Sequence, residues 1–552
     1  MMSPDRNRML SDRMRLVLVA LGALALCVAY LWRGALSSDF WEHAAVVREL
    51  AARPTAPQHP LLQVDAPHAY VSPYLLAVGL VARVTHISAI AALAFAGLVN
   101  LVLLVLAFRR LLVRLLPNGE AAAPYALLLV IFFWGKDAWM WSGFLHIGML
   151  GYDVAYPSTF ATAAMFLALS FLLDALNEDR RRPYLGIALL VAFCFITHPP
   201  TALVLFAALA ALFVARLHAG MVVHAALLTG AVAAGVAASF AWPYFPVLDL
   251  FTDQPPEFHS WSSVFYQTVL PRVWPVVLAL PVLLWRLRAD RRDPLVLLTL
   301  LLAVIYVTGA ITGAYGLGRT IASIAVVVQI ALGAALAAWE FQRPAGRRWL
   351  VPAGTLAVLI GLFAYARPPL PRLLKYDPPE WREVRAILEP VRPGEVVLAD
   401  SPTSYPVPAV TGGRVIAWRH PIYWVPDHAE RRAAQDRFFT AVSNEDRRET
   451  QRRYDVRWVL LNRRRVHLDP AEEAALLALG CAVGQRDSLV LMDVRAGVSC
   501  TPPSRAGTSP APTESGSTGA RPGGRKQSGS WEPVATFIAD YGDEDVGVYL
   551  VR

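Results

Sequence analysis

Apolar runs of 13 to 21 residues, separated by short arginine-rich segments, dominate the chain. A helix of about 20 apolar residues crosses the hydrocarbon core of a bilayer. The charged fraction is 17%, below the roughly 25% of soluble domains, so a polytopic α-helical membrane protein is expected. The pattern predicts about eleven transmembrane helices, near residues 16–36, 89–108, 122–135, 159–175, 184–198, 200–215, 224–242, 274–286, 294–313, 320–339 and 349–366.

Basic residues predict the orientation of these helices. With a cytoplasmic N-terminus, the inside segments carry 17 Lys and Arg, and the longer outside segments before residue 367 carry 6. The first apolar run follows Arg13 and Arg15 and is interpreted as a retained signal anchor. We therefore expect a multi-pass protein of the plasma or inner membrane with its C-terminal part outside. The net charge of +9 reflects topology, and no nucleic-acid partner is expected.

Residues 1–366 are predicted to form the transmembrane domain, with a long outer loop at 37–88. Two apolar patterns in this loop predict further helices. Trp41–Ala52 has apolar residues on one face and is typical of a helix lying in the membrane interface. Tyr74–His86 is too short to span comfortably and predicts a second interfacial or re-entrant helix.

The composition changes after Arg367. Residues 367–500 are predicted to form an extracytoplasmic α/β domain, because short β-type runs alternate with helical stretches. The expected strands are Glu395–Leu398, Arg414–Trp418, Arg457–Leu461 and Ser488–Val494, and the expected helices include Glu380–Leu388 and Ala471–Leu479. Residues 501–530 predict a flexible linker rich in Ser, Pro and Gly, and residues 531–552 a terminal hairpin that returns to the domain.

Four cysteines are present. Cys27 and Cys194 lie inside apolar runs and are expected to be inert packing residues. Cys481 and Cys500 lie in the predicted exported domain, where they either form a disulfide or remain free thiols.

Asp39 and Glu42 open the first outer loop and are candidate catalytic residues. A carboxylate at the membrane boundary, next to an outward-facing cavity, is placed to act as a general base, with Glu42 nearby. The alternative is structural. An acid followed three residues later by Glu is also a capping-box pattern for the helix Trp41–Ala52.

His43 is a candidate substrate-binding residue in the same loop. Together with His59, His68 and the two acids, it could also gather around a divalent cation. The spacing matches no tight metal motif, and loop histidines are often plain surface residues. A divalent cation is therefore only a candidate cofactor.

The second outer loop supplies a further candidate acid, Asp153, and two candidate substrate-binding residues, Lys136 and Tyr156. Lys136 is a cation able to hold a phosphate. Aromatic residues such as Tyr156 could stack on sugar faces, although Trp139 and Trp141 equally fit the aromatic belt of a membrane interface.

His198 and Arg319 are candidate substrate-binding residues at two other outer turns. His198 precedes two prolines, and an imidazole at membrane depth is costly unless it faces a polar cavity. Arg319 follows a glycine-rich turn and could bind a phosphate bidentately. The alternatives are a proline kink with an incidental histidine, and an arginine that anchors to lipid headgroups.

The layout of residues 16–366 resembles the GT-C superfamily of membrane glycosyltransferases that use polyprenyl-phosphate sugars. This group includes protein mannosyltransferases, the aminoarabinose transferase of lipid A and mycobacterial arabinofuranosyltransferases. The resemblance is carried by Asp39 with Glu42-His43, by His59-Pro60, by Ser72-Pro73-Tyr74 and by Tyr156-Pro157-Ser158, and by a soluble domain after the last span. The chain has Asp39 alone, where several members have an adjacent acid pair.

The resemblance implies an enzyme with a GT-C-like fold. It would transfer a sugar, with inversion, from a polyprenyl-phosphate donor to a glycan, lipid or protein acceptor outside the membrane, with Asp39 as the base. The competing interpretations are a lipid or polysaccharide transporter or flippase, and a non-catalytic assembly subunit of the cell envelope. Transporters usually show internal repeats and charges at the bilayer midplane, whereas the candidate residues here lie near the outer boundary.

Overall fold

The computed structural model describes residues 4–34, 36, 38–218, 220–252, 260–342, 380–441 and 443–495. Three predicted features lie outside these residues: the span near 349–366, the linker 501–530 and the hairpin 531–552. Cys500 also lies outside them.

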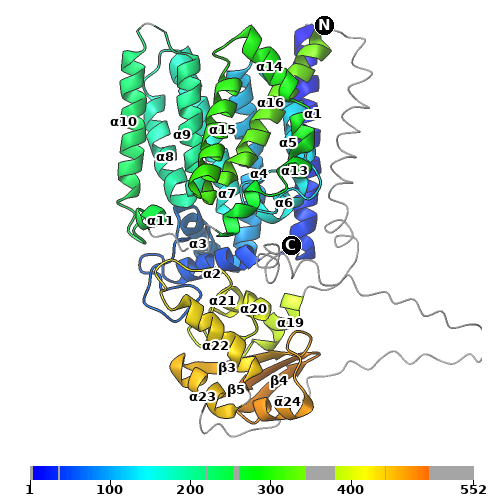
Figure 1. Cartoon of the computed structure of the whole chain (residues 1–552), viewed down its shortest axis with the longest axis vertical. Coiled ribbons are helices and arrows are strands. Elements are labelled where there is room, and N and C mark those ends of the chain that lie inside the picture. The colour runs from blue at the N-terminus through cyan, green and yellow to red at the C-terminus, as the bar shows by residue number, and fades with distance from the viewer. Residues whose placement is uncertain are drawn as a thin grey trace, which may run out of the picture.

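A bundle of roughly parallel helices forms one half of the described structure (Figure 1). Each predicted span within the described residues coincides with a helix, or with the pair α13 and α14. These helices are α1 (Pro4–Arg33), α4 (Ala89–Leu115), α5 (Gly119–Phe132), α7 (Pro157–Asn177), α8 (Pro183–Thr197), α9 (Pro199–Ala215), α10 (Val222–Ser239), α13 (Val269–Val277), α14 (Leu280–Ala289), α15 (Pro294–Thr312) and α16 (Thr320–Gln342).

Six described helices are long and apolar enough to cross a membrane, or seven if the pair α13 and α14, bent by 51°, counts as one span. The chain is thus a multi-pass membrane protein. Helices α5, α8 and α9 are apolar but have only 14, 15 and 17 residues. The total of about eleven crossings therefore stays a prediction.

Local sequence signals fix where the helices start. Proline occupies one of the first two positions of α7, α8, α9 and α15, where its missing N–H costs no helical hydrogen bond. Asp293 caps α15, since its side chain accepts hydrogen bonds from the backbone N–H groups of Leu295 and Val296.

Short elements lie between the long helices, several of them at the end of the bundle opposite the start of α1 (Figure 1). They are α2 (Ser38–Ala52), α3 (Pro73–Thr85), α6 (Ile147–Asp153), α11 (Asp249–Thr252), η1 (Ser263–Tyr266) and η2 (Tyr315–Arg319). Helix α2 lies between the bundle and the C-terminal region (Figure 1). Both helices predicted in loop 37–88 are present, but α2 is buried on its polar face as well as its apolar face. The C-terminal region covers the face expected to meet water and headgroups.

The C-terminal region is a mixed α/β structure, as the sequence predicts. Its sheet has the order β2-β1-β3-β5-β4. The pairs β1–β2 and β1–β3 are parallel, whereas β3–β5 and β4–β5 are antiparallel. The strands are β1 (Val396–Ala399), β2 (Arg414–Val415), β3 (Val456–Asn462), β4 (Cys481–Arg486) and β5 (Leu489–Asp493), and the helices are α19 (Glu380–Ile387), α20 (Ser401–Ser404), α21 (Pro406–Thr411), α22 (His428–Thr440), α23 (Asn444–Arg453) and α24 (Pro470–Leu477).

The two faces of this sheet enter different cores, because side chains alternate along a strand. Val397, Trp458 and Leu491 share one core with residues of α2 and α3. Leu398 and Val459 face the opposite core, which contains residues of α22 and α24. One face of the sheet is therefore continuous with the outer layer of the membrane part.

Cys27 and Cys194, in the membrane part, are buried free thiols, as expected. Cys481, on strand β4, is disulfide-bonded. Its surroundings are thus compatible with an oxidising compartment.

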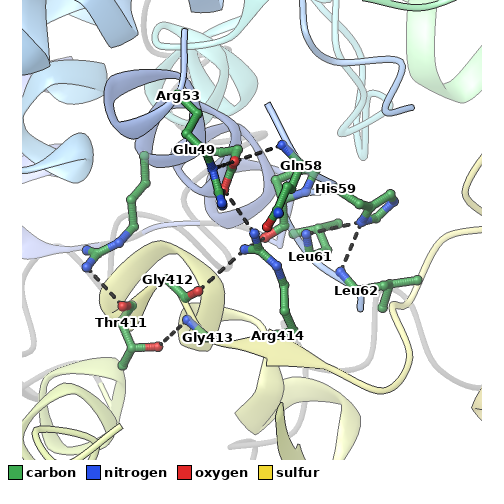
Figure 2. A network of polar contacts seen from close by, with 12 residues as sticks. Glu49, Arg53, Gln58, His59, Leu61, Leu62, Thr411, Gly412, Gly413 and Arg414 are labelled. Carbon is green, nitrogen blue, oxygen red and sulfur yellow. Dashed lines mark hydrogen bonds and ion pairs between the residues drawn. The ribbon is translucent and has the colours of Figure 1, made fainter. Parts of the chain in front are cut away.

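A buried polar network joins α2 to the C-terminal region (Figure 2). Arg414 donates to Glu49 Oε2 at 2.9 Å and to the Pro60 carbonyl at 3.0 Å. Both charged side chains of this pair are only 6% exposed. Arg53, which is 44% exposed, binds the same carboxylate at 2.7 Å.

Two main-chain contacts extend this junction. Leu62 forms a parallel bridge with Val415, whose N–H donates to the Leu61 carbonyl at 2.8 Å, so the outer loop adds to the edge of the sheet. Arg48 donates to the Thr411 carbonyl at 2.9 Å beside Gly412. Gly412 has a φ of +77° and ends α21, and a Cβ there would lie 2.9 Å from Arg48 Nε.

We expect Arg414→Met to destabilise the junction by about 3 kcal/mol, because it leaves the Glu49 carboxylate buried without its buried partner. Arg53→Ala is the matched control and should cost under about 1 kcal/mol, since that side chain is exposed. Thermal unfolding of the purified full chain in detergent, followed together with the rate of limited proteolysis, tests both. Equal destabilisation by the two variants would contradict this account of the junction.

Candidate functional site

Asp39 lies in the first turn of α2, at the boundary between the bundle and the C-terminal region. Since α2 begins at Ser38, the structural alternative for Asp39, a cap of a helix starting at Trp41, is wrong. The carboxylate is still close to the positive end of the helix dipole, which favours its charge. Its side chain is 38% exposed, so solvent reaches it.

The direct partner of Asp39 comes from the C-terminal region. His420 Nε2 donates to Asp39 Oδ1 at 3.2 Å, across 381 positions of sequence. Burial opposes ionisation of Asp39, but the His420 hydrogen bond and the nearby positive groups outweigh it. The pKa of Asp39 consequently lies below its ordinary value. This carboxylate is therefore charged at neutral pH.

Asp153 is the second acid of the site and ends α6. Its side chain is 2% exposed, and its charge interacts with those of Asp39 and Arg319. Burial, and then the charge of Asp39, raise the pKa of Asp153 well above its ordinary value, although the Gly143 backbone N–H counteracts this. Gly143 has a φ of +92°, which favours glycine. The two acids thus have pKa values shifted in opposite directions.

His146 positions the helix that carries Asp153. Its Nδ1 accepts from the Met149 N–H at 3.2 Å and caps α6, while Nε2 donates to the Trp139 carbonyl at 3.0 Å. Burial lowers the pKa of His146 to about 4, so the ring is neutral and holds one tautomer.

Arg319 supplies the cation of the site. It ends η2, and its guanidinium lies 4.9 Å from the centre of the Trp141 ring. Its charge interacts with Asp39, Asp153 and the hydroxyl of Tyr70. His198 is within electrostatic reach of both Arg319 and His43, and its Nδ1 pairs with Thr201 Oγ1 at 2.8 Å.

His43 lies one turn after Asp39 on α2 and packs between two tyrosines. Its ring centre is 4.8 Å from that of Tyr70 and 4.9 Å from that of Tyr156. Burial lowers the pKa of His43 to about 4, against the opposing effect of Asp39, so this ring is uncharged at neutral pH. Tyr156 thus supports His43 by ring packing and is 2% exposed.

The structure therefore brings together most of the residues singled out in the sequence: Asp39, His43, Asp153, Tyr156, His198 and Arg319. Two others are placed differently. Glu42 accepts from Trp418 Nε1 at 3.0 Å and lies 3.3 Å from His68 Nε2, so it joins α2 to the C-terminal region. Lys136 is 67% exposed and pairs with Asp137 at 3.9 Å.

The metal hypothesis receives no support from the arrangement of the histidines. His59 Nδ1 accepts from the backbone N–H groups of Leu61 and Leu62, and its ring packs on His68 at 5.0 Å. Within the described residues, no group of three or more His, Cys, Asp or Glu side chains is arranged to hold a metal ion.

Sequence reasoning missed the contribution of the C-terminal region to this site. Arg419, His420 and Tyr423 interact there with Asp39 or Arg319, and Trp261 packs on His420 at 5.4 Å. The sequence feature that could have indicated this contribution is the run of aromatic and basic residues after the predicted strand 414–418. Tyr70, from the first outer loop, was also missed.

Comparison with known proteins identifies the fold. No protein family profile matches the chain, and no curated protein matches it in sequence. The crystal structure of the apo oligosaccharyltransferase of Archaeoglobus fulgidus matches over 82% of this chain and 69% of its own, at 12% identity and a TM-score of 0.50.

Two other structures of that enzyme also match. One is tethered by a disulfide to an acceptor peptide with the NVT sequon (TM-score 0.46, 12% identity, 81% of this chain and 69% of that one). The other is a complex with Zn and sulfate (TM-score 0.43, 13% identity, 84% and 71%). At such identities the apo structure shows the fold alone: this chain shares the fold of the archaeal oligosaccharyltransferase, which agrees with the predicted resemblance at the level of the fold.

Proposed function

We propose that the protein is a membrane glycosyltransferase that moves a sugar from a polyprenyl-phosphate donor to an acceptor hydroxyl on the outer face of the membrane. One observation carries this proposal. An ionised acid, Asp39, and a cation, Arg319, lie within electrostatic reach of each other at one end of a GT-C bundle, although 280 positions separate them in sequence. A base and a phosphate-binding cation are the two groups that such a transfer needs.

The charge balance of the site supports a donor that bears a phosphate. Asp153 holds its proton more tightly than an ordinary carboxyl, because it is buried beside Asp39. His43 is neutral, so it adds no competing cation. Asp39 is then the more readily ionised of the two acids that interact with Arg319, and the guanidinium keeps the capacity to bind an anionic phosphate.

In the proposed reaction, Asp39 takes the proton of the acceptor hydroxyl as its oxygen attacks the anomeric carbon of the sugar. The bond from that carbon to the phosphate oxygen breaks, and its electron pair stays on the leaving polyprenyl phosphate. Arg319 stabilises the charge that develops on this phosphate. The polyprenyl chain remains in the bilayer, which explains why the site lies at the end of the membrane helices rather than in the C-terminal sheet.

The first test replaces the base. Asp39→Asn keeps the shape and a hydrogen-bond partner for His420, but it cannot accept a proton. We expect transfer to fall by roughly 10²–10⁴-fold while the donor still binds. The assay incubates membranes containing the full chain with polyprenyl phosphates that carry labelled mannose, aminoarabinose or arabinofuranose. Label entering lipid, glycan and protein fractions is counted.

The outcome also separates the competing functions. A transporter would move labelled donor across sealed vesicles without breaking the sugar–phosphate bond. An assembly subunit would keep its function in the Asp39→Asn variant. Unchanged sugar transfer by Asp39→Asn would refute the assignment of the base.

The second test compares two cations. Arg319→Ala should reduce transfer by roughly 10²–10³-fold, because the leaving phosphate loses its positive partner. Lys136→Ala is the matched control and should stay within about twofold of wild type, since Lys136 is exposed and pairs with Asp137. The transfer assay above, at several donor concentrations, measures both. A larger loss for Lys136→Ala than for Arg319→Ala would contradict the proposed phosphate site.

A further inference from the structure

The segment between Trp418 and Trp424 is attached to the membrane part at both ends. Trp418 is buried, and its Nε1 donates to Glu42 on α2 at 3.0 Å. Trp424 Nε1 donates to Asp249 on α11 at 2.9 Å, and its ring packs 5.9 Å from that of Phe245. The residues between these two attachments are therefore held over the outer layer of the bundle.

Helix α22 fixes the same segment from the side of the C-terminal region. His428 Nε2 donates to the Trp418 carbonyl at 3.0 Å, and Arg432 donates to the Arg419 carbonyl at 3.2 Å. Pro421 further restricts the backbone of His420 to extended conformations. Little conformational freedom remains for His420, which loses correspondingly little entropy when it binds Asp39.

We propose that His420 is a positioning residue for Asp39, supplied by the C-terminal region so that this region completes the catalytic centre. The inference rests on the proposed function, because it assigns His420 to the orientation of the proposed base. The Nε2–H of His420 holds Oδ1 of Asp39 at 3.2 Å, and the Trp261 ring at 5.4 Å limits the rotation of the imidazole. A fixed carboxylate meets the acceptor hydroxyl in one orientation, which lowers the entropic part of the barrier.

The same contact sets the acid limit of activity. Among the described residues, the groups that interact with Asp39 are His43 on α2, Tyr70 before α3, Asp153 at the end of α6, Arg319 in η2, and Arg419 with His420 in the C-terminal region. Removal of His420 leaves the effect of burial less opposed, so the pKa of Asp39 rises. The base then becomes protonated at a higher pH, and the acid limb of the rate profile moves upward in pH.

His420→Ala in the full-length, membrane-embedded protein tests the proposal. We expect kcat for sugar transfer to fall by up to roughly 10²-fold, with the KM for the polyprenyl-phosphate sugar within about twofold of wild type. The acid limb of the kcat profile should shift to higher pH. His467→Ala, which removes an exposed histidine of the same region, is the matched control and should change none of these quantities.

His420→Asn separates loss of positioning from a folding defect. Its amide N–H can again donate to Asp39, so this variant should recover part of the kcat that His420→Ala loses. Wild-type kcat and an unshifted acid limb in His420→Ala would overturn the proposal. So would a loss of activity that appears only in KM, because it would indicate a binding or packing role. Failure of the proposed function is distinguished by Asp39→Asn. If that variant still transfers sugar, the base itself is misassigned, whatever His420→Ala does.

Discussion

The burial of the polar face of α2 is the constraint on which the rest of the structure depends. An ionised Glu49 at 6% exposure is costly unless a charged donor meets it, and Arg414 meets it from the C-terminal region. Glu42, which is 4% exposed and lies one turn from Asp39, accepts the Trp418 N–H. The helix that presents the proposed base is thereby joined to the C-terminal region through hydrogen bonds to both buried acids.

This junction explains how loops far apart in the sequence reach one site. Asp39, Asp153 and Arg319 each lie where a helix begins or ends, at the same end of the bundle. The C-terminal region adds His420 from the opposite side. The electrostatic result is asymmetric: the pKa of Asp39 is lowered, while the pKa of the more deeply buried Asp153 is raised well above its ordinary value.

Much of this arrangement could be predicted from the sequence, because membrane helices leave a strong apolar signal. The positions of the described spans, the helix at 74–86 and four of the five strands follow from local pattern. Strand β4 was not predicted, because it lies at the sheet edge, contains Gly484 and is only partly buried. Asp39, Asp153 and Arg319 could be chosen by their place at the predicted outer boundary. His420 could not, because its role depends on a contact across 381 positions that no local pattern encodes.

The bridge between Leu62 and Val415 has a consequence for biogenesis. The loop leaves the ribosome long before strand β2 is made, so its contacts with Val415 and Arg414 form only after the bundle has been synthesised. Sheet closure is then among the last steps of maturation, and contacts of such long range are slow to form. A chain truncated before residue 420 would contain the bundle but lack His420 beside the proposed base. Such a chain would therefore lack the contact that orients Asp39.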